Sequence, residues 1–205
     1  MRHPAEIRRF RPQTKGRCKL PVAVPHQVRV AQVSSPATLF EGARYFSQTQ
    51  ENELQEYGPR ILLGSSEDLL KLAEHVERRS LNLGKLDRAV FVLTDCRDAP
   101  LCDTVRVTLW QTFGVPVYEL LLGGDGSLLA AECEAHEGWH IESGILFSSV
   151  QGQLWYSTRR GRSGGTGLTG DVEAQSCPCG RAGKRLMNIQ MDFQDAVRRR
   201  LPVSA

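Results

Sequence analysis

Three continuous apolar runs, separated by two segments with helix signals, constrain the fold more than any other feature of the sequence. The runs are RILLG at 60–64, RAVFVLT at 88–94 and VPVYELLL at 115–122. Runs of this kind, rich in branched residues, are typical of strands that are covered on both faces. The order strand, helix, strand, helix, strand therefore predicts an α/β fold with a mostly parallel sheet flanked by helices.

The two intervening segments each carry a helix start or stop signal. In the first, Ser65 is followed three residues later by Asp68, which is the spacing of a capping box. The second segment, at 103–114, ends in Gly114, a residue suited to a helix C-terminus. The residues of the first segment that recur at helical spacing and predict its buried face are Leu69, Leu72, Ala73 and Val76.

The chain changes character after residue 143. The segment GILFSSVQGQLWYSTRR predicts two strands around a Gln-Gly turn, whereas GRSGGTGLTG at 161–170 predicts a loop because five of its ten residues are glycine. We therefore divide the chain into three parts. They are a basic flexible leader at 1–25, an α/β subdomain at 26–143, and a small β-rich part at 144–205 that holds a Cys-Pro-Cys segment and a short C-terminal helix.

Composition narrows the classes of protein. The chain has 205 residues, of which 40% are hydrophobic and 24% charged, and these values are ordinary for a globular domain. No apolar run approaches the roughly 20 residues of a membrane span, and the leader has no apolar signal-peptide region, so we expect a cytoplasmic protein without a membrane partner. The composition of the basic leader indicates a solvated segment and not a polyanion-binding arm, because a single aromatic residue, Phe10, is too little interleaving for base stacking. The formal net charge of +3 is also too small to indicate nucleic acid.

Cysteine and histidine gather in two segments of the chain. ECEAHEGWHIE contains Cys133, His136 and His140, and SCPCGRAG contains Cys177 and Cys179. Thiolate and imidazole are the ligands of structural zinc, so two ligands from each segment would tie the two halves together. Two alternatives remain open at this point: a disulfide between Cys177 and Cys179, which would be strained, and unconnected surface thiols. The other cysteines, Cys18, Cys96 and Cys102, have no evident partners.

Two longer segments resemble a known family. FGVPVYELLLGGDGSLLAAECEAHEGWHIE, at 113–142, resembles the middle of the phenylacetate–coenzyme A ligase-like adenylate-forming (AMP-binding) enzymes, in which a Phe-Gly-Val-Pro-Val strand leads into a Tyr-Gly-x-Ser/Thr-Glu motif, a Glu-Cys segment and Gly-x-His-Ile. GLTGDVEAQSCPCGR, at 167–181, is similar to that family's Tyr-Arg-Thr-Gly-Asp and Cys-x-Cys-Gly-Arg motifs. The likeness covers roughly residues 58 to 190. It implies part of the family's large domain, followed by a β-rich segment stapled by zinc.

The resemblance also implies site residues. The structural zinc ligands become Cys133, His140, Cys177 and Cys179, with His136 as the substitute if His140 points elsewhere. Asp171 matches the aspartate that binds the ribose hydroxyls of ATP or AMP, and Asp125 falls where the family has the glutamate that holds Mg²⁺. The residues implied to line the adenine and acyl pocket run from Tyr118 to Gly124 and include Gly123. The alternative is that both aspartates are solvated turn residues.

Departures from the family pattern bear on activity. LGGD at 122–125 replaces the glycine, hydroxyl residue and glutamate of the adenylate motif, and Gly167-Leu168 replaces the Tyr-Arg of the ribose motif Tyr-Arg-Thr-Gly-Asp. Residues 1–57 contain no phosphate-gripping loop, and we find no counterpart of the small domain that carries the family's catalytic lysine. Because adenylation depends on such cations and loop amides, we expect negligible turnover by this chain alone.

Three functions follow from these observations. The first is a truncated, zinc-binding relative of the ligases that binds an acyl or aryl acid, a nucleotide or a partner chain. The second is one half of a split ATP-dependent ligase, completed by a complementing subunit or working as a homodimer. The third is a small zinc module that binds nucleic acid through its leader and the RRGR segment at 159–162.

Overall fold

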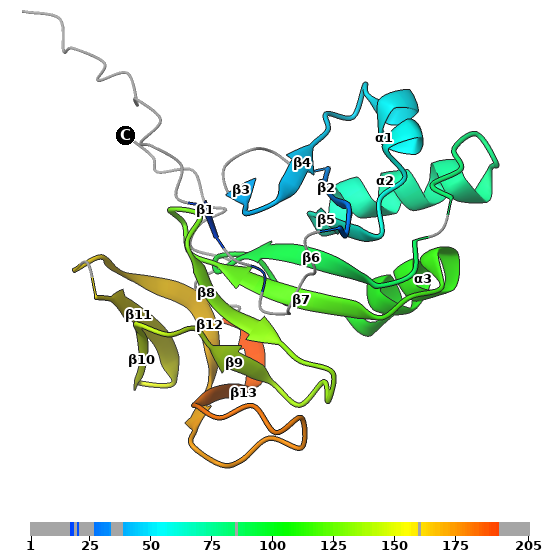
Figure 1. The fold of residues 1–205 in the computed structure, drawn as a ribbon. Helices are drawn as coiled ribbons and strands as arrows, with labels where there is room; N and C mark the ends of the chain where they lie inside the picture. Colours follow the sequence, from blue (N-terminus) through cyan, green and yellow to red (C-terminus); the bar gives the residue numbers. More distant parts are fainter. Residues whose placement is uncertain are drawn as a thin grey trace, which may run out of the picture.

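The computed structural model describes residues 17–18, 20, 27–33, 39–84, 86–159 and 161–192. Most of the predicted basic leader and the C-terminal helix predicted beyond Asp192 lie outside these residues. The described part is dominated by one sheet of eleven strands, while a further two-stranded parallel sheet joins β1 (Arg17–Cys18) to β3 (Leu39–Phe40). Figure 1 shows the helices with the parallel strands in its upper right and the antiparallel strands in its lower left.

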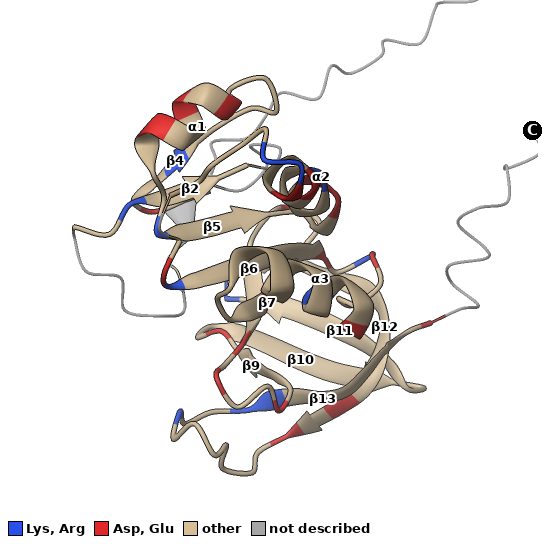
Figure 2. Ribbon diagram, turned by 90° about the vertical axis from the view of Figure 1, so that its right-hand side faces the viewer, with Lys and Arg blue, Asp and Glu red and all other residues tan. Residues whose placement is uncertain are grey.

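The first half of the large sheet is parallel, but the sheet as a whole is mixed, so the predicted mostly parallel sheet is correct for this half only and not for β8 and β9. The order of the parallel half is β4-β2-β5-β6-β7, and each of the predicted apolar runs forms a strand in it. The described helices α1, α2 and α3 all pack on one face of these strands, and acidic residues mark α1 (Figure 2). The element bounds are β2 (Val30–Gln32), β4 (Ala43–Tyr45), α1 (Glu51–Tyr57), β5 (Ile61–Gly64), α2 (Ser66–Glu77), β6 (Ala89–Asp95), α3 (Asp103–Phe113) and β7 (Val117–Leu122).

Local signals place the helices where the sequence predicts them. The Ser65 side chain caps α2 by accepting a hydrogen bond of 3.2 Å from the Asp68 backbone N–H. Gly114 ends α3 in the left-handed conformation that glycine adopts at least cost. The predicted inner face of α2 is confirmed, because Leu69, Leu72 and Ala73 are buried and Val76 packs against the same core.

The second half of the sheet is antiparallel and begins at the β7–β8 hairpin. Its order from β7 outward is β8-β9-β13-β12-β11-β10, so the predicted β-rich part continues the sheet of the α/β part. The division at residue 143 falls between β9 and β10, and it stays a prediction. The bounds are β8 (Leu128–Glu132), β9 (Trp139–Ile141), β10 (Ile145–Val150), β11 (Gln153–Thr158), β12 (Ser163–Glu173) and β13 (Arg185–Met191).

The prediction of a glycine-rich loop at 161–170 is wrong, because residues from Ser163 onward form β12, an eleven-residue strand. Its glycines serve close packing between strands. A Cβ atom on Gly170 would lie 2.5 Å from Ile189 Cδ1 and 2.8 Å from the Met187 carbonyl oxygen. A Cβ on Gly164 would lie 3.2 Å from the Tyr156 ring. Glycine therefore marks close approach of neighbouring side chains and backbone here, which composition alone cannot distinguish from a turn.

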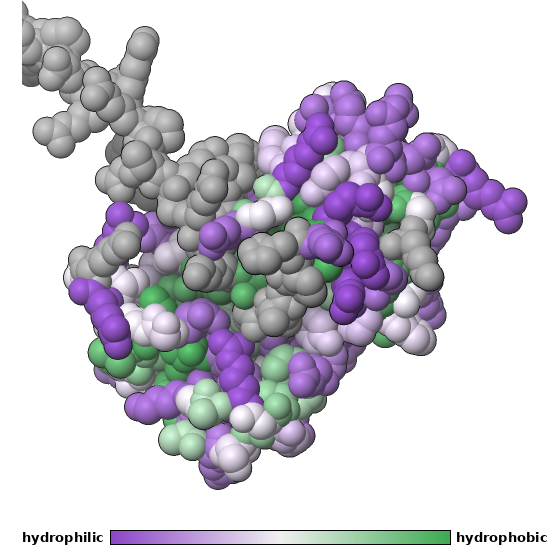
Figure 3. Space-filling view, viewed as in Figure 1, coloured by the Kyte–Doolittle hydropathy of each residue, from purple (hydrophilic) through white to green (hydrophobic). Residues whose placement is uncertain are grey.

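The antiparallel strands enclose a core of their own. Leu121, Leu129, Leu154, Leu168 and Leu186, which come from five different strands, are all fully buried in it. The outer side of the β10–β11 hairpin exposes Leu146, Val150 and Trp155 among polar residues, and Figure 3 shows hydrophobic residues over this lower-left part of the molecule. Within the described residues, no helix is long and apolar enough to cross a membrane.

Candidate metal centre and adjacent charge network

Four potential metal ligands from two distant segments meet at one place. Cys133 follows β8, His140 lies in β9, and Cys177 and Cys179 lie in the loop between β12 and β13. The Sγ atoms of Cys133 and Cys177 are 3.6 Å apart, and Cys179 Sγ is 3.3 Å from His140 Nε2. All four ligand atoms lie within 4.8 Å of one another. The structure thus brings together the four residues that the family resemblance selects.

The distances suit a tetrahedral ion better than a disulfide. Zinc bonds of about 2.3 Å to sulfur and about 2.0 Å to nitrogen place tetrahedral S···S pairs about 3.8 Å and S···N pairs about 3.5 Å apart. The observed 3.6 Å and 3.3 Å are close to these values. A disulfide needs about 2.05 Å between its sulfur atoms, so the Cys133–Cys177 contact is no disulfide. Cys177 and Cys179 are likewise free thiols.

Tight turns aim the ligands inward. The His136 N–H donates to the Cys133 carbonyl at 3.0 Å, and the Gly180 N–H donates to the Cys177 carbonyl at 2.9 Å. The backbone N–H of Arg181 donates to Cys179 Sγ at 3.4 Å, so the same turn also holds the second sulfur of the Cys-Pro-Cys segment. Gly138 is required between the ligands Cys133 and His140, because its φ is +77° and a Cβ atom would lie 2.4 Å from the Leu186 carbonyl oxygen.

His136, the substitute ligand, lies outside the group. Its ring stacks on Tyr118 with 5.2 Å between ring centroids, and its Nδ1 is 2.9 Å from Glu132 Oε1. His140 is instead almost fully buried, and its Nε2 faces Cys179. The geometry therefore selects His140 over His136.

The electrostatic surroundings act differently on the ligands. Burial raises the pKa of Cys133 to about 11, whereas burial of Cys177 is outweighed by hydrogen bonds from Cys179 and Cys133 that lower its pKa. Burial lowers the pKa of His140, and the charges of Arg181 and Arg185 lower it further. The imidazole is thereby kept neutral, which is the form that binds a metal ion.

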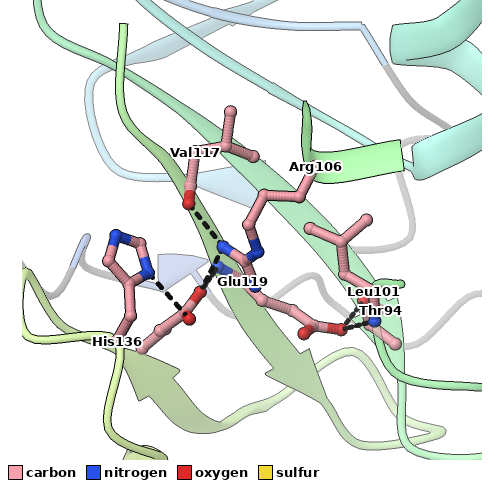
Figure 4. Close-up of polar contacts among 7 residues, drawn as sticks. Thr94, Leu101, Arg106, Val117, Glu119 and His136 are labelled. Carbon is pink, nitrogen blue, oxygen red and sulfur yellow. Dashed lines mark hydrogen bonds and ion pairs between the residues drawn. The ribbon is translucent and has the colours of Figure 1, made fainter. Parts of the chain in front are cut away.

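A buried charge network, which the sequence analysis did not predict, joins the metal-ligand segment to the parallel sheet (Figure 4). Glu132, next to Cys133, accepts a hydrogen bond of 2.9 Å from Arg106 Nη1 on α3 and another of 2.9 Å from the backbone N–H of Glu119. The same Arg106 nitrogen also donates to the Val117 carbonyl at 2.6 Å. The network therefore fixes the end of β8 from which Cys133 projects.

Glu119 is a second buried acid beside this network. Its Oε1 accepts hydrogen bonds from the Thr94 hydroxyl at 2.6 Å and from the Leu101 backbone N–H at 2.8 Å (Figure 4). Burial raises the pKa of Glu119 from 4.5 to about 7 despite these bonds. The signal that sequence reasoning missed is a lone acid inside the apolar run VYELLL.

The residues expected to bind nucleotide are separated in the structure. Gly123, Gly124 and Asp125 form the β7–β8 turn, whereas Tyr118 lies near the other end of β7 and Asp171 lies in β12. No hydrogen bond, ion pair or ring contact joins Asp125, Asp171 and Tyr118 to one another within the described residues. Their expected roles stay predictions.

Both expected carboxylates already have partners. Asp125 accepts bonds from Ser127 Oγ at 2.6 Å and Arg162 Nη1 at 2.6 Å, and these outweigh burial and lower its pKa. Asp171 Oδ2 accepts a bond of 2.9 Å from Asn188 Nδ2. The carboxylate expected to bind Mg²⁺ is therefore neutralised by an arginine in this structure.

Comparison with known proteins identifies the fold. No family model matches the sequence, and no curated protein matches it. Among solved structures, a 2-hydroxyisobutyryl-CoA ligase in the postadenylation state is similar, with a TM-score of 0.64 at 16% identity, over 82% of this chain and 44% of that chain. Coronafacic acid ligase from Pectobacterium brasiliense is similar with a TM-score of 0.56 at 10% identity, over 85% of this chain and 41% of that chain.

The comparison bears on fold rather than on chemistry. The chain spans less than half the length of the ligases that it matches. One of these ligases was solved in complex with 2-HIB-AMP and CoA, and those ligands belong to that protein. The chain therefore has the fold of part of the adenylate-forming CoA ligases.

Proposed function

We propose that this chain is a zinc-binding, ligase-like domain that binds an acyl or nucleotide ligand or a partner chain and does not complete adenylation by itself. The observation that carries the proposal is the Cys₃His group, whose ligand atoms lie within 4.8 Å of one another. This group sits in a fold shared with part of the CoA ligases. A reduced thiol site also suits a cytoplasmic protein.

The metal's role in this proposal is structural. The thiolates of Cys133, Cys177 and Cys179 and the Nε2 atom of His140 would hold the ion, so that protein ligands occupy all four positions. Catalytic zinc keeps one position for water or substrate, whereas a closed set ties segments together. Here the tie joins the turn after β8 to the loop between β12 and β13.

The metal is tested by elemental analysis of reductant-treated protein, which should contain about one zinc per chain, as expected for one four-ligand site. Cys177→Ser should lower the melting temperature, and a chelator should lower that of the wild type in the same way. Cys102→Ser is the matched control, because Cys102 is exposed and outside the group. Protein that is metal-free yet as stable to heat as the zinc-loaded form would refute the proposal.

Ligand binding is the second part of the proposal. If Asp171 binds ribose hydroxyls, calorimetry should detect ATP or AMP binding that Asp171→Ala abolishes and Glu173→Ala, in the same strand, retains. Flat titrations with both the wild type and Asp171→Ala would remove the nucleotide site from the proposal. Mg²⁺ at Asp125 would have to displace Arg162, so Arg162→Gln should strengthen Mg²⁺-dependent ATP binding.

A half of a split ligase is the second candidate function, completed by another chain or a second copy. A partner is favoured by three apolar side chains on the β10–β11 hairpin: Leu146, Val150 and Trp155 expose 70%, 54% and 45% of their surface. Sedimentation over a concentration series distinguishes a homodimer from a monomer, and Trp155→Ser should weaken a dimer built on this surface. Nucleic acid is disfavoured further, because Arg162 of the RRGR segment is engaged by Asp125.

A further inference from the structure

The proposed metal centre has a charge that the fold must balance, and this inference rests on the proposed function. Three thiolates, a neutral imidazole and one divalent ion together carry one net negative charge. One side of the centre is enclosed, since His140 is 1% and Cys177 6% exposed, whereas Cys133 and Cys179 are half-buried. A buried charge is costly unless an opposite charge or hydrogen bonds accompany it. A buried cation beside the ligands would therefore stabilise the loaded centre.

Arg185 is such a cation. It is the first residue of β13, its exposure is 4%, and it pairs directly with His140 across the β13–β9 ladder. Side chains of directly opposed residues project from the same face of a sheet, with Cβ atoms about 4.5–5.5 Å apart. Figure 2 shows the basic start of β13 beside β9. The register thus sets the guanidinium next to the metal ligands.

The other partners of Arg185 are a backbone carbonyl and one exposed carboxylate. Its Nη1 donates to the Glu137 backbone carbonyl at 2.9 Å, while the Glu137 carboxylate is 3.7 Å away and 53% exposed. Its Nε is buried and has no hydrogen-bond partner among the described residues. Arg181, the other nearby arginine, is already paired with Glu142 at 2.8 Å.

We propose that Arg185 is the built-in counter-charge of the metal centre and holds the turn that carries two of its ligands. The guanidinium offsets the net negative charge of the loaded site. Through the Glu137 carbonyl it also fixes the turn between Cys133 and His140. Arg185 is a positioning residue, because it acts on the metal through the ligands. Its charge stabilises the loaded form, whereas in the metal-free form the same buried cation has only the exposed Glu137 carboxylate, at 3.7 Å, as an opposite charge.

The test uses the full chain and Arg185→Met, which replaces the aliphatic stem of arginine by a flexible apolar side chain and removes its charge. Zinc affinity is measured under reducing conditions by competition with a chromophoric chelator. Arg185→Met should weaken zinc binding about 10- to 100-fold, the range found for residues that support metal ligands. Lys184→Met, an equal change of charge at the exposed neighbour, should change it less than about threefold, because exposed charges are screened. Arg185→Lys should restore most of the affinity.

Two further readouts separate a counter-charge from a merely structural role. The Co²⁺-loaded variant should keep the thiolate charge-transfer band of the wild type, which shows that the ligand set is intact. Urea unfolding of the metal-free proteins should find Arg185→Met at least as stable as the wild type. Equal zinc affinities, or equal losses of stability with and without metal, would overturn the inference. If the wild type binds no zinc, the proposed function itself fails.

Discussion

Replacing Glu119 by glutamine should remove a pH dependence from the free energy of unfolding. Glu119 is 2% exposed, and burial raises its pKa from 4.5 to about 7. Between these two values the folded protein binds a proton that the unfolded chain releases. The stability that this proton contributes is therefore complete below pH 4.5 and is lost as the pH rises through 7.

The size of the effect follows from the two pKa values. The shift from 4.5 to about 7 corresponds to about 3 kcal/mol over the whole range, and about 2 kcal/mol of this falls between pH 5.5 and pH 8. Glutamine does not titrate and still offers an oxygen to the Thr94 hydroxyl and the Leu101 N–H. The free energy of unfolding of the variant, relative to that of the wild type, should therefore rise by about 2 kcal/mol from pH 5.5 to pH 8.

Urea unfolding at several pH values with saturating zinc measures this difference. Proton competition at the metal ligands affects both proteins alike, so it cancels when the variant is compared with the wild type. Glu67→Gln, at an exposed position of α2, is the control and should differ from the wild type by less than about 0.5 kcal/mol at each pH. A Glu119→Gln difference that stays constant from pH 5.5 to pH 8 would refute the reasoning.

Two further predictions concern local structure. Gly170→Ala should lower the free energy of unfolding by about 1–3 kcal/mol, because its Cβ would overlap Ile189 and the Met187 carbonyl. Gly165→Ala in the same strand should cost less, because its Cβ would meet Trp155 at an ordinary 3.5 Å. Urea denaturation compares the two variants, and equal costs would contradict the packing argument. Ser65→Ala should lower the free energy of unfolding by about 1 kcal/mol, because the α2 cap is lost, and Ser65→Thr should keep most of the stability of the wild type in the same assay. A Ser65→Ala variant as stable as the wild type would show that the cap bond contributes nothing.

The central parallel strands β5, β6 and β7 could be predicted because their apolar residues are buried on both faces, whereas the parallel edge strand β4 has no buried residue and gave no such signal. Ile61–Gly64 is buried at every position, so its apolar run has no polar interruption. Helix α1 gave no such signal, because only Leu54 of its seven residues is buried and one buried position defines no period. Strand β12 is predicted as a loop because its glycines usually signal turns, whereas in the structure Gly170 sits where the neighbouring strand leaves no room for a Cβ atom.

Part of the candidate site could be predicted from the sequence, and part depends on how the strands pair. Donor chemistry and the resemblance together select four ligands, and the fold places them in one group because β9 pairs with β13. The role of Arg185 could not be predicted from the sequence, because its position opposite His140 depends on strand register. No local pattern specifies the register of so short a ladder. The roles of Glu119 and Arg106 could not be predicted for the same reason, because their shared neighbour Glu132 belongs to a third element.

Residues that are close in the sequence can lie far apart in this fold, and residues that are far apart in the sequence can be in contact. Tyr118 and Gly123 are five residues apart, but a strand rises about 3.3 Å per residue, so they lie about 16 Å apart at opposite ends of β7. Cys133 and Cys177 are 44 residues apart, yet their sulfur atoms lie within 3.6 Å. A pocket inferred from contiguous residues must therefore be tested by substituting residues at both ends of β7. A metal centre inferred from distant pairs is already constrained by the strand pairing that brings them together.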